Sequence, residues 1–395
     1  MANVLILGGS EYQKFAILSI KKDSHIIHLL DRDEDPFCKK YADYFKAIDY
    51  SDKLKVLKYT KDNKIDCIVP LNDFGVHAAF FVSQKLGLIN PSYLTAKCAT
   101  DKGLMRDIWN IEQIPQPKFK IFNKNDNIEI SGDLSFPVVV KPTDSSGGRG
   151  ITVANNGKEL QFSIDLAKSF TVHNNRIIIE EFVDGVEVTV ECIAYKGNIK
   201  LLTMSDKVKP DSKYRVATSL NYPAYFNESV KKRIFNIVLS ASESLGIANG
   251  MIHAELIVSQ DESVIKIVEL GARGGGGHVF GQIINTVTGI DAPKEYTNIL
   301  LGKTPKLESN VNNGCVYRFF NPSKNGIIKS INYDIKIFEN DFVLDYGFTS
   351  KVGDSYDGLS NSLKRIGFVV VSGNDREEAI KNADYIEKNI LFEIK

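Results

Sequence analysis

The stretch that decides the fold runs from Phe136 to Gly150 and reads FPVVVKPTDSSGGRG. Its first half is typical of a buried β-strand, because its residues are apolar and β-branched apart from one lysine, Lys141, near its end. Its second half is a Ser/Gly loop that contains Ser145, Ser146, Gly147 and Gly148. A lysine fixed on a strand is a point charge for phosphate, and the N–H groups of such a loop can close over phosphate oxygens. The sequence therefore predicts a phosphate-binding strand and loop in preference to a solvated hairpin turn.

A second apolar strand, RIIIEEF at 176–182, ends in two adjacent carboxylates and is followed by a turn and another strand. Adenine requires an acceptor for its exocyclic amine and a donor for a ring nitrogen. Exposed backbone at a strand end supplies both beside apolar walls. The segment is therefore a candidate for binding a purine base. The alternative, a hairpin with ordinary surface acids, stays open for Glu181.

Two further strands, IHAEL at 252–256 and IVEL at 267–270, each carry one glutamate among apolar residues and are predicted to pair as a hairpin. Charged residues inside apolar strands are otherwise costly. Glu255 and Glu269 would form an oxygen cage suited to Mg²⁺ if both point into one site. Arg273 follows shortly and can fork onto phosphoryl oxygens. A surface salt bridge is the competing interpretation.

The rest of the chain divides into regions by pattern. Residues 1–95 alternate short apolar runs with amphipathic stretches, which predicts βα units around a parallel sheet. The segment 118–205 is rich in β-branched strands, with one helix at about 158–170. A helix from 227 to 246 precedes the hairpin, and a helix opened by Asp375 lies near the end.

A Gly-rich turn, LGGS at 7–10, follows the first strand, and Asp31 closes the next one. This pattern matches a dinucleotide-binding turn only in part, because Glu11, Tyr12 and Gln13 stand where a later glycine is required. NAD binding is therefore disfavoured. We expect a tight strand-to-helix turn, with contact to a second substrate as a minor hypothesis.

Composition excludes several classes of function. Basic and acidic residues number 49 each, so the whole chain shows no electrostatic footprint for nucleic acid or an anionic membrane. The five cysteines are scattered and form no CxxC pair, which argues against a disulfide framework or a zinc site. The sequence has no basic leader and no apolar run long enough to span a membrane. We expect a cytoplasmic protein that acts on small molecules.

Taken together, these motifs resemble the ATP-grasp superfamily, whose pattern is a strand with a lysine, a mobile glycine-rich loop, an acidic hinge, and a distal acidic pair with an arginine. The resemblance covers nearly the whole chain. It implies that Lys141 contacts the α- and β-phosphates of ATP and that Lys102, farther upstream, is a second phosphate-binding lysine. Without the other motifs, Lys102 would read equally well as a solvated helix residue.

The same resemblance assigns the nucleoside. It implies that Glu180 and the backbone of Glu181 and Val183 read adenine. It also implies that Glu187 accepts hydrogen bonds from both ribose hydroxyls.

The chain departs from the family pattern at Gly271, where an asparagine usually follows the second metal glutamate, so a second metal ion would need another ligand. The run of glycines at 274–277 is more open than the loop of a biotin carboxylase, which implies space for a larger carboxylate or amine. The candidate substrate contacts are Arg215, Arg273, Gly276 and His278. A structural role at the start of a helix at 278–289 stays open for His278. Near Arg215, the lysines Lys207, Lys209 and Lys213 fit either a mobile cover over an anionic substrate or a solvated charge run.

The expected architecture is α/β and α+β multidomain. A Rossmann-like domain (1–95) precedes an ATP-grasp module (96–305) with a lid at about 115–185, and an α+β domain (306–395) ends the chain. The layout resembles L-amino-acid ligases and the biotin-carboxylase-like group. It implies an enzyme that activates a carboxylate as an acyl phosphate, joins it to an amine, and releases ADP and phosphate.

Two alternatives stay open. One is a purine-pathway ligase similar to glycinamide ribonucleotide synthetase, for which no sugar-phosphate site is visible. The other is an ATP-binding regulatory protein with weak turnover, which only Gly271 favours. The expected ligands are ATP, Mg²⁺ or Mn²⁺, and a small carboxylate and amine, without nucleic acid or membrane partners. A homodimer stays open.

Overall fold

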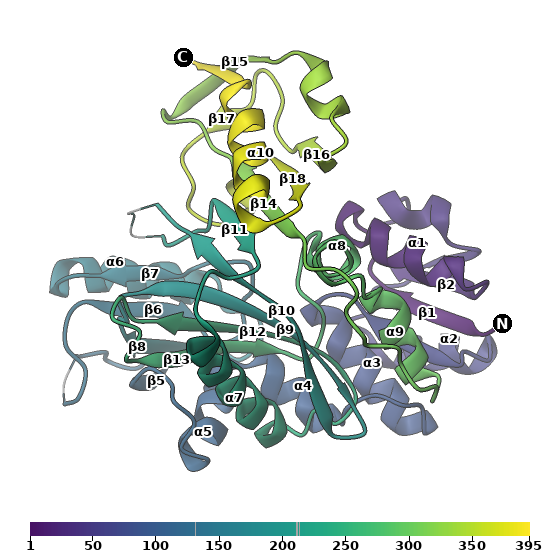
Figure 1. Cartoon of the computed structure of the whole chain (residues 1–395). Coiled ribbons are helices and arrows are strands. Elements are labelled where there is room, and N and C mark those ends of the chain that lie inside the picture. The colour runs from purple at the N-terminus through teal and green to yellow at the C-terminus, as the bar shows by residue number, and fades with distance from the viewer. Residues whose placement is uncertain (131, 211, 213) are drawn as a thin grey trace.

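The structure, a computed structural model, describes residues 1–130, 132–210, 212 and 214–395. Its N-terminal elements are β1 (Asn3–Leu7), η1 (Glu11–Gln13), α1 (Lys14–Lys22), β2 (Ile26–Asp31), η2 (Phe37–Tyr41), β3 (Tyr44–Ala47), α2 (Lys53–Asp62), β4 (Cys67–Pro70), α3 (Asp73–Leu86) and α4 (Tyr93–Thr100). The strands form a parallel sheet in the order β3-β2-β1-β4, as the alternating apolar runs predict (Figure 1). Strand β1 is central and almost fully buried, which explains its unbroken apolar sequence.

The turn after β1 is held by the chain itself. Gly8 has φ 100°, in the left-handed region that favours glycine. The backbone N–H of Gly9 donates to the Asp31 carboxylate at 2.7 Å. The acid at the end of β2 therefore stabilises the turn, in agreement with a tight strand-to-helix connection.

A second four-stranded sheet lies within the segment predicted to be a lid, and we refer to it as the lid. Its elements are β5 (Phe119–Asn123), β6 (Val138–Pro142), β7 (Thr152–Ala154), α6 (Gly157–Ser169) and β8 (Arg176–Glu181), with the strands in the antiparallel order β5-β8-β6-β7. Helix α6 packs Leu160 and Ile164 against Val138 and Val140 of the decisive strand β6. This small core lies at the left of Figure 1, apart from the N-terminal sheet.

An eight-stranded antiparallel sheet forms the centre of the molecule, in the order β13-β12-β9-β10-β11-β14-β18-β16. Its strands are β9 (Val186–Tyr195), β10 (Asn198–Val208), β11 (Ser219–Tyr222), β12 (Gly250–Val258), β13 (Ile265–Gly271), β14 (Gly314–Phe320), β16 (Val343–Phe348) and β18 (Gly367–Gly373). The sheet runs through the boundary expected at residue 305, because β14, β16 and β18 extend it. The predicted hairpin is the β12–β13 pair.

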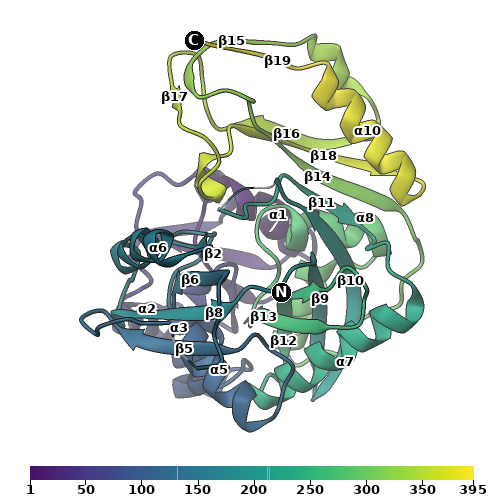
Figure 2. The same cartoon turned by 90° about the vertical axis from the view of Figure 1, so that its left-hand side faces the viewer.

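Helices cover this sheet and complete the C-terminal part. They are α5 (Lys102–Ile111), α7 (Glu228–Ser244), α8 (Ile284–Thr288), α9 (Ala292–Leu300) and α10 (Arg376–Lys388), with the short η4 (Ile335–Glu339) and η5 (Ser362–Lys364). The helix expected at 278–289 is a π-helical turn, Val279–Ile283, followed by α8. A small sheet, β17-β15-β19, is built from Ser355–Tyr356, Gly326–Asn332 and Leu391–Ile394 and lies at the top and left of the C-terminal part in Figure 2, with α10 at the right.

All five cysteines are free and buried, in agreement with the absence of a disulfide framework. Among the helices of the described residues, none is long and apolar enough to cross a membrane.

Trp109 anchors α5 and provides a test of this packing. Its side chain is fully buried in the core, whereas Ile111 on the same helix is 76% exposed. We predict that Trp109→Ala lowers the free energy of unfolding by about 3–5 kcal/mol, because it leaves a large cavity. Ile111→Ala should change it by less than about 0.5 kcal/mol. Denaturant unfolding checks this, and similar losses in the two variants would contradict the packing.

Candidate active site

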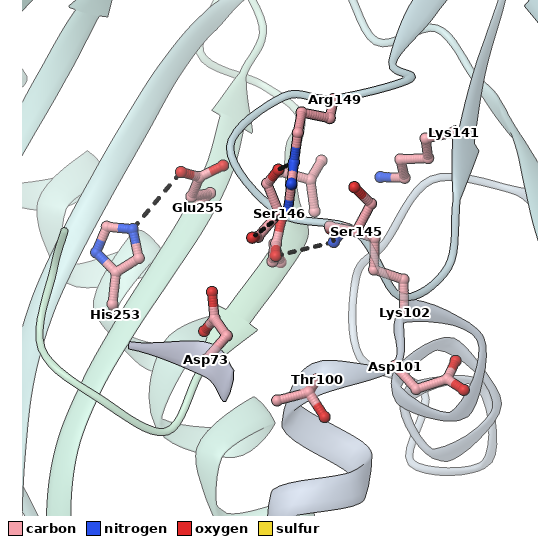
Figure 3. A network of polar contacts seen from close by, with 12 residues as sticks. Asp73, Thr100, Asp101, Lys102, Lys141, Ser145, Ser146, Arg149, His253 and Glu255 are labelled. Carbon is pink, nitrogen blue, oxygen red and sulfur yellow. Dashed lines mark hydrogen bonds and ion pairs between the residues drawn. The ribbon is translucent and has the colours of Figure 1, made fainter. Parts of the chain in front are cut away.

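A cavity of about 700 Å³ lies where the lid, the central sheet and the N-terminal sheet meet. Its walls include Val139 of the lid, Ile257 of the central sheet, Asn72 beside α3, and Arg365 of the C-terminal part. Most of the side chains that the sequence nominates face this one space. Figure 3 shows part of the polar network beside it.

Lys141 lies at the end of β6, as predicted, and its partner is Glu180 at the end of the neighbouring β8. The Lys141 Nζ is 2.6 Å from one Glu180 oxygen, and Arg106 of α5 binds the other at 2.7 Å. Burial lowers the pKa of Lys141, although Glu180 opposes this effect. The Glu180 side chain is thus held between two cations, and its predicted contact with adenine stays a prediction.

Arg106 completes this buried cluster and connects two sheets. It is fully buried, and its remaining N–H groups donate to the carbonyl oxygens of Ile267 and Val268 on β13 at 3.2 and 2.9 Å. The cluster therefore fixes the lid strand β8 to the central sheet. Arg106 stands four residues after Lys102, so the two cations share one face of α5.

Lys102 is the second cation beside the cavity. Its Nζ donates to the Ser145 carbonyl at 2.9 Å and to Glu269 at 3.0 Å (Figure 3). Burial opposes its charge, but Glu269 outweighs this and raises the pKa of Lys102. Lys102 and Ser145 lie behind the cavity wall, whereas Glu269 forms part of that wall.

The Ser/Gly loop after β6 faces the cavity with Ser146, Gly147 and Gly148. Gly147 and Gly148 have φ 68° and 73°, which glycine adopts without strain and which turns successive N–H groups to one side. Arg149 bonds back to the Ser146 carbonyl at 2.9 Å, so its guanidinium braces the loop. The loop geometry suits a phosphate chain.

The hinge after β8 separates the roles of its residues. Glu181 directs its carboxylate away to Lys266, with both oxygens at 2.8 Å, and so acts as an ion-pair partner. Val183 lines the cavity, and within the described residues its backbone N–H has no hydrogen-bond partner. The hinge therefore offers a free donor beside the apolar walls Val139 and Ile257.

Glu187, predicted to bind ribose, belongs to a second charge cluster. Lys207 bridges Glu187 and Glu255, at 2.6 Å from each, and Lys209 contacts the other Glu187 oxygen. Burial raises the pKa of Glu187, but the two lysines outweigh it and hold the pKa below its ordinary value. The sequence allowed two interpretations of Lys207 and Lys209, a mobile cover or a solvated charge run. In the structure both lysines line the cavity and pair with its glutamates. Lys213, in the same segment, lies outside the described residues.

The predicted acidic pair comes together as expected. Glu255 and Glu269 are directly opposed in the β12–β13 register, and both line the cavity. Among the described residues, no group of three or more acidic, His or Cys side chains is arranged to hold a metal ion. Two carboxylates with nucleotide oxygens are nevertheless the ligand set that Mg²⁺ usually takes in phosphate-binding sites. The donors therefore fit Mg²⁺ once Lys207 and Lys102 release them.

His253 lines the cavity beside Glu255, and its Nε2 lies 3.6 Å from a Glu255 oxygen. It contacts the fully buried Glu191, which also accepts the N–H of Gly275 at 3.0 Å. Burial opposes protonation, but Glu191 raises the pKa of His253 to about 9. His253 is therefore a charged, hydrogen-bonded member of the hairpin.

Arg273 reaches across to the N-terminal region. Its Nε and one terminal nitrogen bind both oxygens of Asp73, at the start of α3, at 2.7 and 2.9 Å. Burial opposes this charge, but Asp73 outweighs it and raises the pKa of Arg273. The two-pronged donor expected for a phosphoryl group is thus satisfied by a carboxylate, and both residues line the cavity.

The remaining substrate candidates divide. Arg215 and Gly276 line the cavity, and Arg215 lies 5.6 Å from the Phe182 ring. His278 does not line it. Its ring is buried among aromatic side chains, and burial lowers its pKa to about 4, which favours its structural interpretation.

Sequence reasoning missed four members of this site, which are Arg106, Asp73, Glu191 and Arg365. Two of these residues carried a signal in the sequence. Arg106 stands four residues after Lys102 and so lies on the same helix face, and Glu191 is an acid inside the apolar strand VECIAY. Asp73 looks like an ordinary helix N-terminal acid, because its partner is 200 residues away. Arg365 begins the apolar run RIGFVVVSG and looks like an ordinary charged residue at the start of a strand.

We predict that Arg106→Met lowers the free energy of unfolding by about 3–5 kcal/mol, because it leaves Glu180 buried with one cation. The matched change Arg176→Met breaks the 2.6 Å pair with Asp101, whose arginine side chain is 26% exposed, and should cost about 1 kcal/mol or less. Denaturant unfolding of both variants measures the difference. Equal costs would mean that the Glu180 cluster does not hold the lid.

Comparison with known proteins agrees with this geometry. Residues 134–281 match the model of the ATP-grasp domain, and residues 318–395 match L-amino acid ligase C-terminal domain 2. The L-arginine-specific L-amino acid ligase of Bacillus subtilis is 23% identical over 352 residues, covering 86% of this chain and 85% of that protein.

Solved structures show the same fold. The L-amino acid ligase of Bacillus licheniformis superposes with TM-score 0.85 at 19% identity, covering 100% of this chain and 99% of that one. The phosphoribosylglycinamide synthetase of Anaerococcus prevotii gives TM-score 0.76 at 20% identity, with both chains fully covered. The chain therefore carries an ATP-grasp domain and an L-amino acid ligase C-terminal domain, and it is similar over most of its length to ATP-dependent ligases that contain both.

Proposed function

We propose that this ligase joins two amino acids through an acyl phosphate. One observation carries the proposal: the residues expected to bind nucleotide, metal and phosphoryl group line the same cavity. They are the hinge, the Ser/Gly loop, Lys141, Arg273 and the opposed glutamates Glu255 and Glu269. The L-amino acid ligase domain and the similarity to the B. subtilis enzyme support amino acids as both substrates.

The nucleotide would lie between the lid and the central sheet. The Val183 N–H is a donor for adenine, with Val139 and Ile257 as apolar walls. Lys141 and the N–H groups of the Ser/Gly loop would bind phosphate oxygens. Glu187 reaches the ribose only if Lys207 and Lys209 shift toward the phosphates, because both now occupy its carboxylate.

Glu255 and Glu269 would hold Mg²⁺, and Mn²⁺ accepts the same oxygen ligands. When bound, the ion neutralises phosphate charge during transfer. The lysines Lys207 and Lys102 leave the carboxylates in exchange for phosphate oxygens, so the site keeps its charge balance. The carboxylates that would bind the metal ion are thus the ones that pair with lysines in the structure.

In the first step, an oxygen of the donor carboxylate attacks the γ-phosphorus of ATP, and the bond to the β,γ-bridging oxygen breaks, which releases ADP. In the second, the amine attacks the acyl carbon, the tetrahedral adduct expels inorganic phosphate, and the nitrogen loses a proton. Arg273 lines the cavity and would stabilise the charge on the transferring phosphoryl and on the adduct. This requires Arg273 to turn one or both prongs away from Asp73.

The two alternatives are less well supported. The likeness to phosphoribosylglycinamide synthetase concerns the fold, whereas the matched C-terminal domain is that of amino-acid ligases. A purely regulatory role gives no reason to place two opposed carboxylates and an arginine in the nucleotide cavity.

The direct test is a screen of amino-acid pairs with Mg²⁺ and ATP, read by phosphate release and product mass. We predict a dipeptide in amounts equal to ADP and phosphate. Formation of AMP and pyrophosphate would contradict the acyl-phosphate route, and ATP turnover with no product for any pair would contradict the ligase function.

Arg273→Lys separates catalysis from structure. Lysine keeps the charge but loses the planar fork, so we predict a loss of about 2 kcal/mol of transition-state stabilisation, or roughly 30-fold in kcat, with ATP affinity nearly unchanged. Asp73→Asn is the matched control, because it removes the charge of the partner and leaves the guanidinium. If Arg273→Lys turns over normally and both variants only lose thermal stability, Arg273 is a structural ion-pair residue.

A further inference from the structure

Arg365 is a cationic side chain in the cavity wall to which the proposed chemistry assigns no role. It follows η5 and precedes β18, and it reaches the cavity from the C-terminal part. Its guanidinium carbon lies 3.5 Å from the centroid of the Phe319 ring, and one terminal nitrogen donates to the Ala217 carbonyl at 2.8 Å. These contacts fix the plane of the guanidinium but leave part of its fork unused.

The positive charge of Arg365 lacks an acidic partner among the described residues. Its Nε is buried without a hydrogen-bond acceptor, and the neighbouring groups that act on its charge are the phenols of Tyr317 and Tyr12 rather than carboxylates. Arg273, in the same cavity, has Asp73 as a bidentate partner. A largely buried guanidinium without an anion is costly, and this cost falls if a ligand supplies the anion. Burial also lowers the pKa of Arg365 to about 10, which is consistent with a missing counter-charge.

The turn that carries Arg365 also touches the nucleotide loop. Ser362 donates to the Gly147 carbonyl through its hydroxyl at 2.8 Å and through its N–H at 3.3 Å. In Figure 2 this short yellow turn descends from the C-terminal part toward the lid. A ligand held by Arg365 would therefore lie close to the place where the phosphates of ATP are expected.

We infer that Arg365 binds the free carboxylate of the amine substrate, so that this substrate is an α-amino acid and becomes the C-terminal residue of the product. The inference rests on the proposed function. The reaction involves two substrate carboxylates. The carboxylate of the donor is converted to an acyl phosphate and is no longer a free anion, whereas the carboxylate of the amine substrate remains anionic throughout. A fixed arginine suits the second, since its bond is made equally before and after transfer.

The surroundings of Arg365 indicate the kind of side chain that accompanies this carboxylate. Leu220, Tyr317, Phe319 and Phe368 line the same cavity, and Tyr317 packs against both phenylalanines. These walls are apolar or aromatic. The amine substrate is accordingly an amino acid with an apolar side chain.

The test compares L-leucine with L-leucinamide, which keeps the side chain and the amine but has no carboxylate. Calorimetry on the full chain measures the binding of each compound. The kcat/KM of each compound as the amine substrate measures how well the enzyme converts it. For the unchanged protein we expect L-leucine to be favoured at least about 30-fold, and for Arg365→Met the preference should fall to within about 3-fold. Arg365→Lys should retain part of it, because the charge remains.

Arg318→Met is the matched control, since Arg318 lies in the same part of the chain but pairs with Asp384 and Glu387 outside the cavity. It should leave the preference unchanged. ADP affinity and melting temperature show whether each variant is folded, and Arg365→Gln, which also removes the charge, replaces Arg365→Met if the latter is not. The inference is overturned if Arg365→Met weakens the binding of L-leucine and L-leucinamide equally. It is also overturned if the preference for L-leucine is unchanged in both Arg365→Met and Arg365→Lys.

Failure of the proposed function gives a different pattern. In that case no amino-acid pair supports product formation, yet carboxylate-dependent binding of L-leucine that is lost in Arg365→Met would still assign the subsite. Dipeptide formation with leucinamide and leucine used equally would retain the function and reject the role of Arg365. If L-leucine neither binds nor reacts in preference to its amide, the inference is wrong.

Discussion

Glu180 lies buried between Arg106 and Lys141, and the arrangement of the nucleotide site depends on this carboxylate. It ends one lid strand, its lysine partner ends the neighbouring lid strand, and its arginine partner donates to the backbone of the central sheet. A charge at such depth is tolerated only when opposite charges and hydrogen bonds satisfy it. The requirement therefore fixes the position of Lys141 and the start of the hinge relative to the sheet that carries the metal-binding candidates.

The same rule governs the rest of the site. Lys102 pairs with Glu269, and Lys207 pairs with Glu255 and Glu187, so each acidic group expected to bind metal or ribose is neutralised by a cation expected to bind phosphate. Nucleotide and Mg²⁺ can replace these pairs without leaving an uncompensated charge. In such a site the charged groups are already gathered around the cavity, although ligand binding must exchange their partners.

Much of this arrangement could be predicted from local sequence, because the signals are charges placed in apolar strands. Lys141 after three valines and the glutamates of the β12–β13 hairpin are recognisable in this way, whereas the register that places Glu255 opposite Glu269 is known only from the structure. The Asp73–Arg273 pair could not be predicted, since its two residues lie 200 positions apart in the sequence. The continuation of the central sheet into β14, β16 and β18 is likewise set by pairing between distant strands. The role of each site residue stays a prediction.

The central claim is that the donor carboxylate attacks the γ-phosphorus, so its oxygen must end in the released phosphate. The most direct measurement uses a donor amino acid labelled with ¹⁸O in its carboxylate, with the amine substrate found by the screen. Mass analysis of inorganic phosphate should show one labelled oxygen for each peptide bond formed. Unlabelled phosphate accompanying dipeptide synthesis, or label recovered in AMP, would contradict the account.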